Sequence, residues 1–241
     1  MNVPTSVVFE IFGAVLGFWI PGITQNIAGY KGKKDTAIAV DEYYTGTIYK
    51  MLFCLLNAWA WTFASLQKEN MMSALFLSLL FTLAIIIAVI DFRIQIIPNE
   101  LVLTMLLVGF VFQVVSSGFS ALAASALCML AMMILFIAVA GMVGFGKVGA
   151  GDVKLAGAMG LALGYPSIIT ALIMMGVLLL LYCIFGLISK KMTMQSMFPF
   201  APFMMLGMIG SLTWRMVGPG LPNGAALGNL PLIMVNTGKL F

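Results

Sequence analysis

Long apolar stretches separated by short polar breaks dominate the pattern of this chain. A helix that crosses a bilayer needs about 20 predominantly apolar residues, and most of these stretches come close to that length. The pattern therefore predicts an all-α, polytopic transmembrane helical bundle of about eight spans. The expected spans are residues 6–28, 49–66, 71–91, 99–117, 120–142, 152–164, 166–189 and 199–217.

The short stretch at residues 152–164 has two interpretations. It is barely long enough to cross a membrane, and it is rich in small residues. One interpretation is a tilted helix that packs closely on its neighbours through Gly157, Gly160 and Gly164. The other is a re-entrant segment, which would change the parity of the topology.

Composition supports lipid as the main solvent and excludes several chemistries. Hydrophobic residues make up 62% of the chain and charged residues 8%, against about 25% charged residues in soluble domains. There is no histidine, which excludes HExxH zinc proteases and proteases with a Ser–His or Cys–His pair. Cys54, Cys128 and Cys183 lie singly in apolar runs, so neither a disulfide framework nor a zinc site is expected.

The distribution of basic residues predicts an orientation. Cytoplasmic loops carry an excess of Lys and Arg, and eight spans with the N-terminus outside would place nine basic residues in the cytoplasm. These are Lys31, Lys33, Lys34, Lys50, Arg93, Lys147, Lys154, Lys190 and Lys191; Lys68, Arg215 and Lys239 fall outside. The net charge of +4 is too small and scattered to indicate nucleic-acid binding.

The same pattern predicts one membrane domain over residues 1–241. It divides into N-terminal spans at 1–66 with a short cytoplasmic loop at 29–48, a core at 71–217, and an irregular outer tail at 218–241. Further cytoplasmic loops are expected at residues 92–98, 143–151 and 190–198.

Asp91 and Asp152 are the candidate chemical groups, because each stands at the edge of an apolar stretch. Ionisable side chains near the membrane interior are costly and commonly functional, although a loop charge that only marks topology is the alternative for each one alone. The predicted topology puts both at the cytoplasmic face, on adjacent loops. Two carboxyls within hydrogen-bond reach share a proton, and such a pair can activate a water and polarise a carbonyl.

Three motifs around these aspartates resemble those of type IV prepilin peptidases. Residues 149–155 (GAGDVKL) are similar to the GxGD-x-K-L signature of that family. Asp91 follows Ile90, and an IPN sequence at 97–99 comes soon after, which is similar to the family's first aspartate motif. Residues 198–203 (FPFAPF) resemble its PFGP motif. The motifs occur in the family's order across roughly residues 85–210.

The resemblance implies a polytopic aspartic endopeptidase that removes the basic leader peptide of type IV prepilins or pseudopilins. It implies a location in the bacterial plasma (inner) membrane, a site at the cytoplasmic face, and Asp91 and Asp152 as the catalytic pair. It implies neither a metal nor a cofactor for proteolysis. The residues expected to bind substrate are Gly149, Gly151, Lys154, Pro98, Asn99, Pro199 and Pro202.

Several of these roles have plainer alternatives. Lys154 either contacts the substrate or anchors a helix at the lipid headgroups. Pro199 and Pro202 either shape a substrate cleft or only break the start of the last span. The expected partners are the substrates and the bilayer, without nucleic acid, and the oligomeric state stays open.

Departures from the family concern a second activity. Many relatives carry a longer loop after the first span, with paired CxxC motifs, and also N-methylate the new N-terminus. Here the loop at 29–48 is short and has no cysteine, which puts methylation in doubt, and S-adenosylmethionine would be a cofactor only if that activity is retained. A proton-coupled transporter using the same acids and a membrane methyltransferase are the alternative functions. Presenilin-like peptidases share GxGD but pair it with YD and PAL motifs, whereas here Asp91 follows Ile90 and no PAL occurs.

Overall fold

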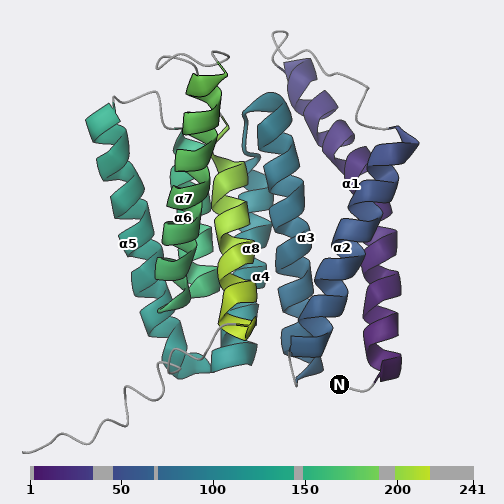
Figure 1. The fold of residues 1–241 in the computed structure, drawn as a ribbon. Coiled ribbons are helices and arrows are strands. Elements are labelled where there is room, and N and C mark those ends of the chain that lie inside the picture. The colour runs from purple at the N-terminus through teal and green to yellow at the C-terminus, as the bar shows by residue number, and fades with distance from the viewer. Residues whose placement is uncertain (1–2, 35–45, 68–69, 144–148, 190–198, 218–241) are drawn as a thin grey trace, which may run out of the picture.

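The computed structural model describes residues 3–34, 46–67, 70–143, 149–189 and 199–217. Within these ranges the chain forms α-helices only, and consecutive helices alternate in direction along the bundle (Figure 1). The helices are α1 (Val3–Lys34), α2 (Thr47–Gln67), α3 (Met71–Ile94), α4 (Asn99–Ser117), α5 (Phe119–Val143), α6 (Ala150–Leu163), α7 (Ser167–Ile188) and α8 (Ala201–Val217). The predicted all-α bundle is confirmed.

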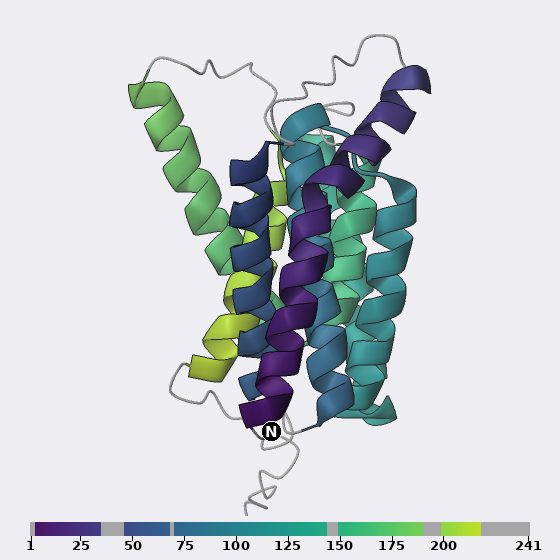
Figure 2. The same cartoon turned by 90° about the vertical axis from the view of Figure 1, so that its right-hand side faces the viewer.

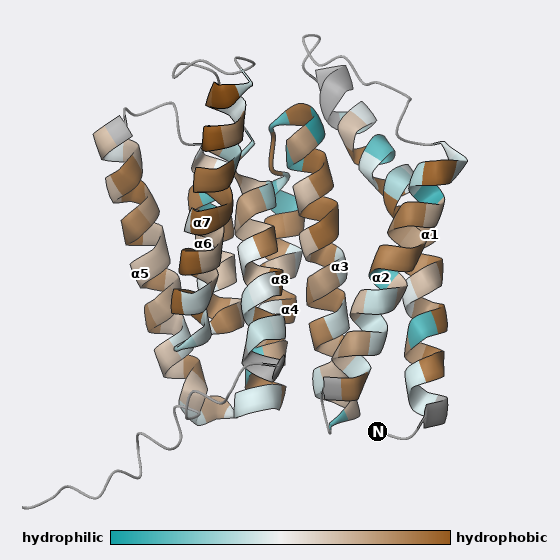
Figure 3. Ribbon diagram, in the orientation of Figure 1, coloured by the Kyte–Doolittle hydropathy of each residue, from teal (hydrophilic) through white to brown (hydrophobic). Residues whose placement is uncertain are grey.

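Five of the described helices, α1, α3, α4, α5 and α7, are long and apolar enough to cross a membrane. Hydrophobic residues, brown in Figure 3, occur along most of the length of α3, α5 and α7. The apolar helix α8 is shorter. These lengths support a multi-pass membrane protein, while the count of eight spans and the outside position of the N-terminus stay predictions.

Three helix boundaries differ from those expected. The first helix continues to Lys34, so the beginning of the expected loop at 29–48 is helical. Helix α3 continues past Asp91 to Ile94 and ends where Gln95 adopts a left-handed backbone conformation, with φ of 52°. Helix α6 begins at Ala150 and not at Asp152. The tail at 218–241 and the loop at 190–198 lie outside the described residues.

Helix α6 lies inside the bundle. It packs on α4, α5, α7 and α8, and every residue from Leu155 to Leu163 is buried. Its 14 residues extend for about 21 Å, less than the bilayer core of about 30 Å. It runs antiparallel to both α5 and α7 (Figure 1), and whether it crosses the membrane fully or is re-entrant stays open.

Glycines explain how α5 and α6 approach so closely. A Cβ added to Gly160 would lie 2.7 Å from the carbonyl oxygen of Cys128, and one added to Gly157 would lie 2.8 Å from Cγ of Met133. The absence of a side chain lets the backbone of α5 approach Gly160 and lets the Met133 side chain pack on Gly157. The close packing expected at these two glycines is confirmed.

A buried polar network joins the first three helices, where α1 lies against α2 (Figure 2). The Asn57 amide donates to the Gly13 carbonyl at 2.8 Å, and the Thr82 hydroxyl donates to Asn57 Oδ1 at 2.9 Å. The Trp61 indole donates to Thr82 Oγ1 at 2.9 Å. Polar side chains that pair across apolar helices hold those helices in register, so this network fixes α1 and α2 against the side of α3.

Candidate active site

Asp91 occupies the last turns of α3, where its side chain is only 4% exposed. The helix ends just beyond it, because the N–H of Gln95 donates to the Asp91 carbonyl at 2.9 Å and the chain then turns. Pro98 is the N-cap of α4 and its N-terminal neighbour is restricted to extended conformations. The apolar run that precedes Asp91 therefore delivers a carboxyl to one end of the bundle.

The N-terminus of α8 meets the Asp91 carboxyl. The backbone N–H of Ala201 donates to Asp91 Oδ2 at 3.0 Å, and the backbone N–H of Phe200 is a second donor. The first N–H groups of a helix have no partner within it, and they form the positive end of its dipole. Asp91 thus receives from α8 the donors that water would otherwise supply.

Asp152 lies in the first turn of α6, outside the five candidate spans. Gly149 is the N-cap, and its N–H donates to Asp152 Oδ2 at 3.1 Å. Partial burial raises the pKa of the Asp152 carboxyl above its ordinary value of 3.8, and the Gly149 hydrogen bond opposes part of that rise. Because the helix begins two residues earlier than expected, the carboxyl is oriented by its own helix terminus.

The 95–98 linker and the start of α4 hold the first turn of α6 in place. A Cβ added to Gly151 would lie 3.2 Å from Cβ of Ile97, so the glycine lets α6 approach the linker that follows Asp91. The Lys154 ammonium donates to Asn99 Oδ1 at 3.0 Å. These two contacts connect the first turn of α6 to residues only a few positions beyond Asp91.

The C-terminal end of α3 and the N-terminal end of α6 lie at the same end of the bundle (Figure 1). Helices α4 and α8 each pack on both of them, so the two carboxyls stand at one end of the same packed group of four helices. A pair with distinct environments can supply one general base and one general acid.

The other predicted site residues divide into two groups. Around Asp152 lie Gly149, Gly151 and Lys154, with Pro98 and Asn99 at the start of α4. On the Asp91 side lie Pro199, which is buried, and Pro202, which is in the first turn of α8. A proline in that turn removes no helical hydrogen bond, so Pro202 marks the helix start without taking a donor from Asp91.

The sequence motifs contain Phe200, Ala201 and Ile97, but no site role was predicted for the two backbone donors or for the Ile97 contact. A signal existed for the donors, because a proline within the first turn indicates a helix N-terminus whose free N–H groups attract an anion. Among the described residues, no group of three Cys, Asp or Glu side chains is placed to hold a metal ion.

Comparison with known protein families gives a match that covers both aspartates. Residues 78–188 match the model of the type IV leader peptidase family. The matched segment contains Asp91 and Asp152 and ends before α8, so Ala201 lies beyond it. No curated protein and no solved structure matches the chain.

Proposed function

We propose, from the premise that residues 78–188 place this chain in the type IV leader peptidase family, that it is an aspartic endopeptidase of prepilins or pseudopilins. In this proposal Asp91 and Asp152 are the catalytic pair, and the product is a pilin-like protein without its basic leader. The supporting observation is that α3 and α6 bring the two carboxyls to the same end of the bundle, where each accepts a hydrogen bond from a helix-terminal backbone N–H (Figure 1).

The pair can perform the steps of peptide hydrolysis. The ionised carboxyl takes a proton from a water molecule while the water oxygen bonds to the scissile carbonyl carbon. The protonated carboxyl donates its hydrogen to the carbonyl oxygen as charge develops there. The C–N bond then breaks, and the leaving amine takes the proton that came from water. As the C=O bond re-forms, a hydroxyl of the tetrahedral intermediate returns its proton to the carboxyl that had donated one.

The expected location of this chemistry is the cytoplasmic face of the bacterial plasma membrane. Nine of the twelve basic residues fall on the side that carries both aspartates in the predicted topology, and such a bias marks the cytoplasmic side. A prepilin substrate fits this arrangement, since its apolar helix lies in the bilayer and its basic leader stays in the cytoplasm.

Co-expression with a prepilin tests the proposal. Asp91→Asn and Asp152→Asn keep the size of each side chain but remove its ability to carry a proton, so we expect leader removal to fall below detection in both. Glu10→Gln, an exposed acid on α1, is the matched control and is expected to process normally. Processing at the wild-type rate by either Asn variant would overturn the assignment.

Mass spectrometry of the processed prepilin adds a second readout. The mass of the new N-terminal peptide gives the cleavage position and shows whether that terminus is methylated. The expected loop at 29–48 is short and lacks cysteines. We therefore expect the new N-terminus to be unmethylated, whether or not S-adenosylmethionine is supplied.

A further inference from the structure

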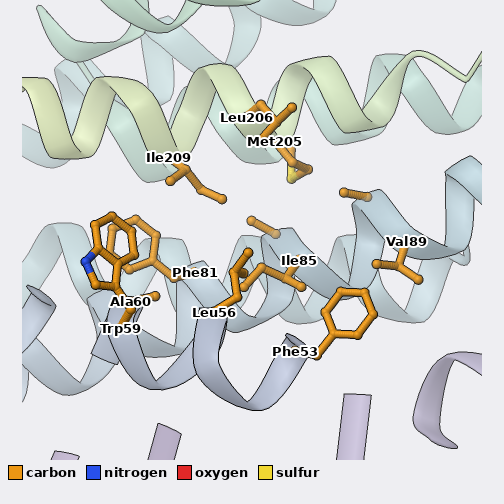
Figure 4. Close-up of a pocket in the computed structure, with 12 residues that line it drawn as sticks. Phe53, Leu56, Trp59, Ala60, Phe81, Ile85, Val89, Met205, Leu206 and Ile209 are labelled. Carbon is orange, nitrogen blue, oxygen red and sulfur yellow. The ribbon is translucent and has the colours of Figure 1, made fainter. Parts of the chain in front are cut away.

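An apolar groove of about 360 Å³ opens between α2, α3 and α8. Its lining includes Phe53 and Trp59 from α2, Ile85 and Val89 from α3, and Met205 and Ile209 from α8 (Figure 4). None of the residues that line it is charged. The groove is therefore a surface for an apolar occupant within the bilayer.

One end of this groove lies close to the level of the candidate active site, measured along α3 and α8. Val89 stands two residues before Asp91 on α3, a rise of about 3 Å along the helix. On α8, Met205 is about one turn after Ala201, which donates to the Asp91 carboxyl. The groove runs along α3 from Phe81 to Val89 (Figure 4), which is about 12 Å at the rise of a helix.

We propose that this groove docks the transmembrane helix of the leader-bearing substrate, an inference that rests on the proposed function. A helix that binds in a groove inserts side chains at positions i, i+3 or i+4, and i+7, which extend over about 10.5 Å. That length matches the groove. The volume accommodates side chains from one face of a helix, so the substrate helix lies along α2 and α8 rather than inside the bundle.

The docked helix would place its own end beside Asp91. If the apolar face of the substrate helix ends at Val89, that helix ends within a few ångströms of Asp91, measured along the axis of α3. The segment that joins the docked helix to the leader then passes the aspartate pair on its way to the solvent. The groove thus determines both the side from which the substrate enters and the position of the cleaved bond.

Two other occupants fit the groove less well. A phospholipid needs a polar or cationic partner for its headgroup, and the lining residues offer no charge to bind it. A second copy of the chain, related by a two-fold axis through the groove, would present the same concave surface. Neither alternative explains why the groove ends close to the level of Asp91 along α3.

A groove-filling variant tests the proposal on activity. Ala88 lines the groove, so Ala88→Trp should block it, whereas Ala124→Trp adds the same side chain on the exposed face of α5. We expect Ala88→Trp to lower kcat/KM for a full-length prepilin by at least about tenfold, equivalent to ~1.4 kcal/mol. Cleavage of a soluble peptide that contains the leader and the junction but no apolar helix should stay within about twofold, as should Ala124→Trp on both substrates. Equal losses on both substrates, or no loss on either, would overturn the proposal.

Site-specific photocrosslinking separates this inference from the proposed function. A photoreactive residue at Leu206 in the groove should crosslink to the helix of a full-length prepilin, while one at Leu180, on the exposed face of α7, should not. Crosslinks at Leu206 only to lipid, or only to a second copy, overturn the docking proposal even if cleavage is normal. Crosslinking to the prepilin without any cleavage by the wild type would keep the docking surface and overturn the peptidase assignment.

Discussion

The backbone N–H of Ala201 donates to Asp91 Oδ2 at 3.0 Å, across 110 positions of the chain. This bond makes the start of α8 part of the site that α3 and α6 provide with carboxyls. Helix α8 lies beyond the segment that matches the leader peptidase family. Its role is to orient and stabilise Asp91 through backbone atoms, while the Ala201 methyl group is fully buried in the core. Among residues that the helix start accepts, one lacks the backbone donor altogether.

That residue is proline, which has no N–H to donate. Ala201→Pro is compatible with the first position of α8 but removes the hydrogen bond to Asp91. A hydrogen bond to a charged group contributes about 1.5–3 kcal/mol, so we expect kcat to fall by roughly 10- to 150-fold. Pro202→Ala is the matched control, because it changes the neighbouring proline and keeps the Ala201 N–H. Wild-type kcat in a folded Ala201→Pro enzyme would contradict the assigned role.

The order of the helices was predictable because it follows from local pattern. The expected stretch at 99–117 began just after Pro98 and ended before Gly118, and the stretch at 152–164 ended before Pro166; each of these three positions separates two helices in the structure. The exact start of α6 was not predictable, because Gly149 and Ala150 carry no side chain that marks a cap. The number of spans and the orientation of the N-terminus remain predictions.

The site was predictable only in part, for a physical reason. Asp91 and Asp152 stood out because charged groups at the edge of apolar stretches are costly and rare. The donors to Asp91 are backbone atoms of a distant helix, and a contact between residues 110 positions apart leaves no periodic signal. The network of Asn57 and Thr82 escaped notice for the same reason, since each side chain is an isolated polar group in its own helix.

Substitution of Gly151 tests the contact between α6 and the linker after Asp91. A Cβ there would lie 3.2 Å from Cβ of Ile97, so Gly151→Ala requires Ile97 or the first turn of α6 to move by a few tenths of an ångström, and Gly151→Val requires a larger movement. Overpacking of this kind costs about 1–3 kcal/mol, and we expect graded losses of kcat measured with a prepilin substrate. Gly176→Ala is the control, because a Cβ there meets nothing within 4 Å. Equal activity of the Ala and Val variants would show that the contact does not position Asp152.

The Asn99–Lys154 hydrogen bond separates the two roles considered for Lys154. If Lys154 acts mainly through its 3.0 Å bond to Asn99, then Asn99→Ala, Lys154→Met and the double variant should be non-additive. The expected coupling is about 0.5–1 kcal/mol in kcat/KM, as for an ordinary hydrogen bond in an exposed position. A loss on Lys154→Met that is as large in the Asn99→Ala background as in the wild type would instead indicate contact with the substrate.

The environment of Asp152 predicts a pH dependence of stability. Burial raises the pKa of this carboxyl above 3.8 in the folded protein, so the folded state binds more protons than the unfolded state between 3.8 and the raised value. The contribution of Asp152 to the free energy of unfolding therefore falls as pH rises through that interval and is highest below it. Asp152→Asn carries no titrating proton and keeps an oxygen that can accept from the Gly149 N–H.

Thermal unfolding in detergent micelles from pH 4 to pH 8 measures this effect. The Tm of the wild type should decrease relative to that of Asp152→Asn as the pH rises, with the difference levelling off once Asp152 is ionised in both states. A Tm difference between wild type and Asp152→Asn that stays constant with pH, or that changes in the opposite direction, would show that burial does not favour the protonated carboxyl.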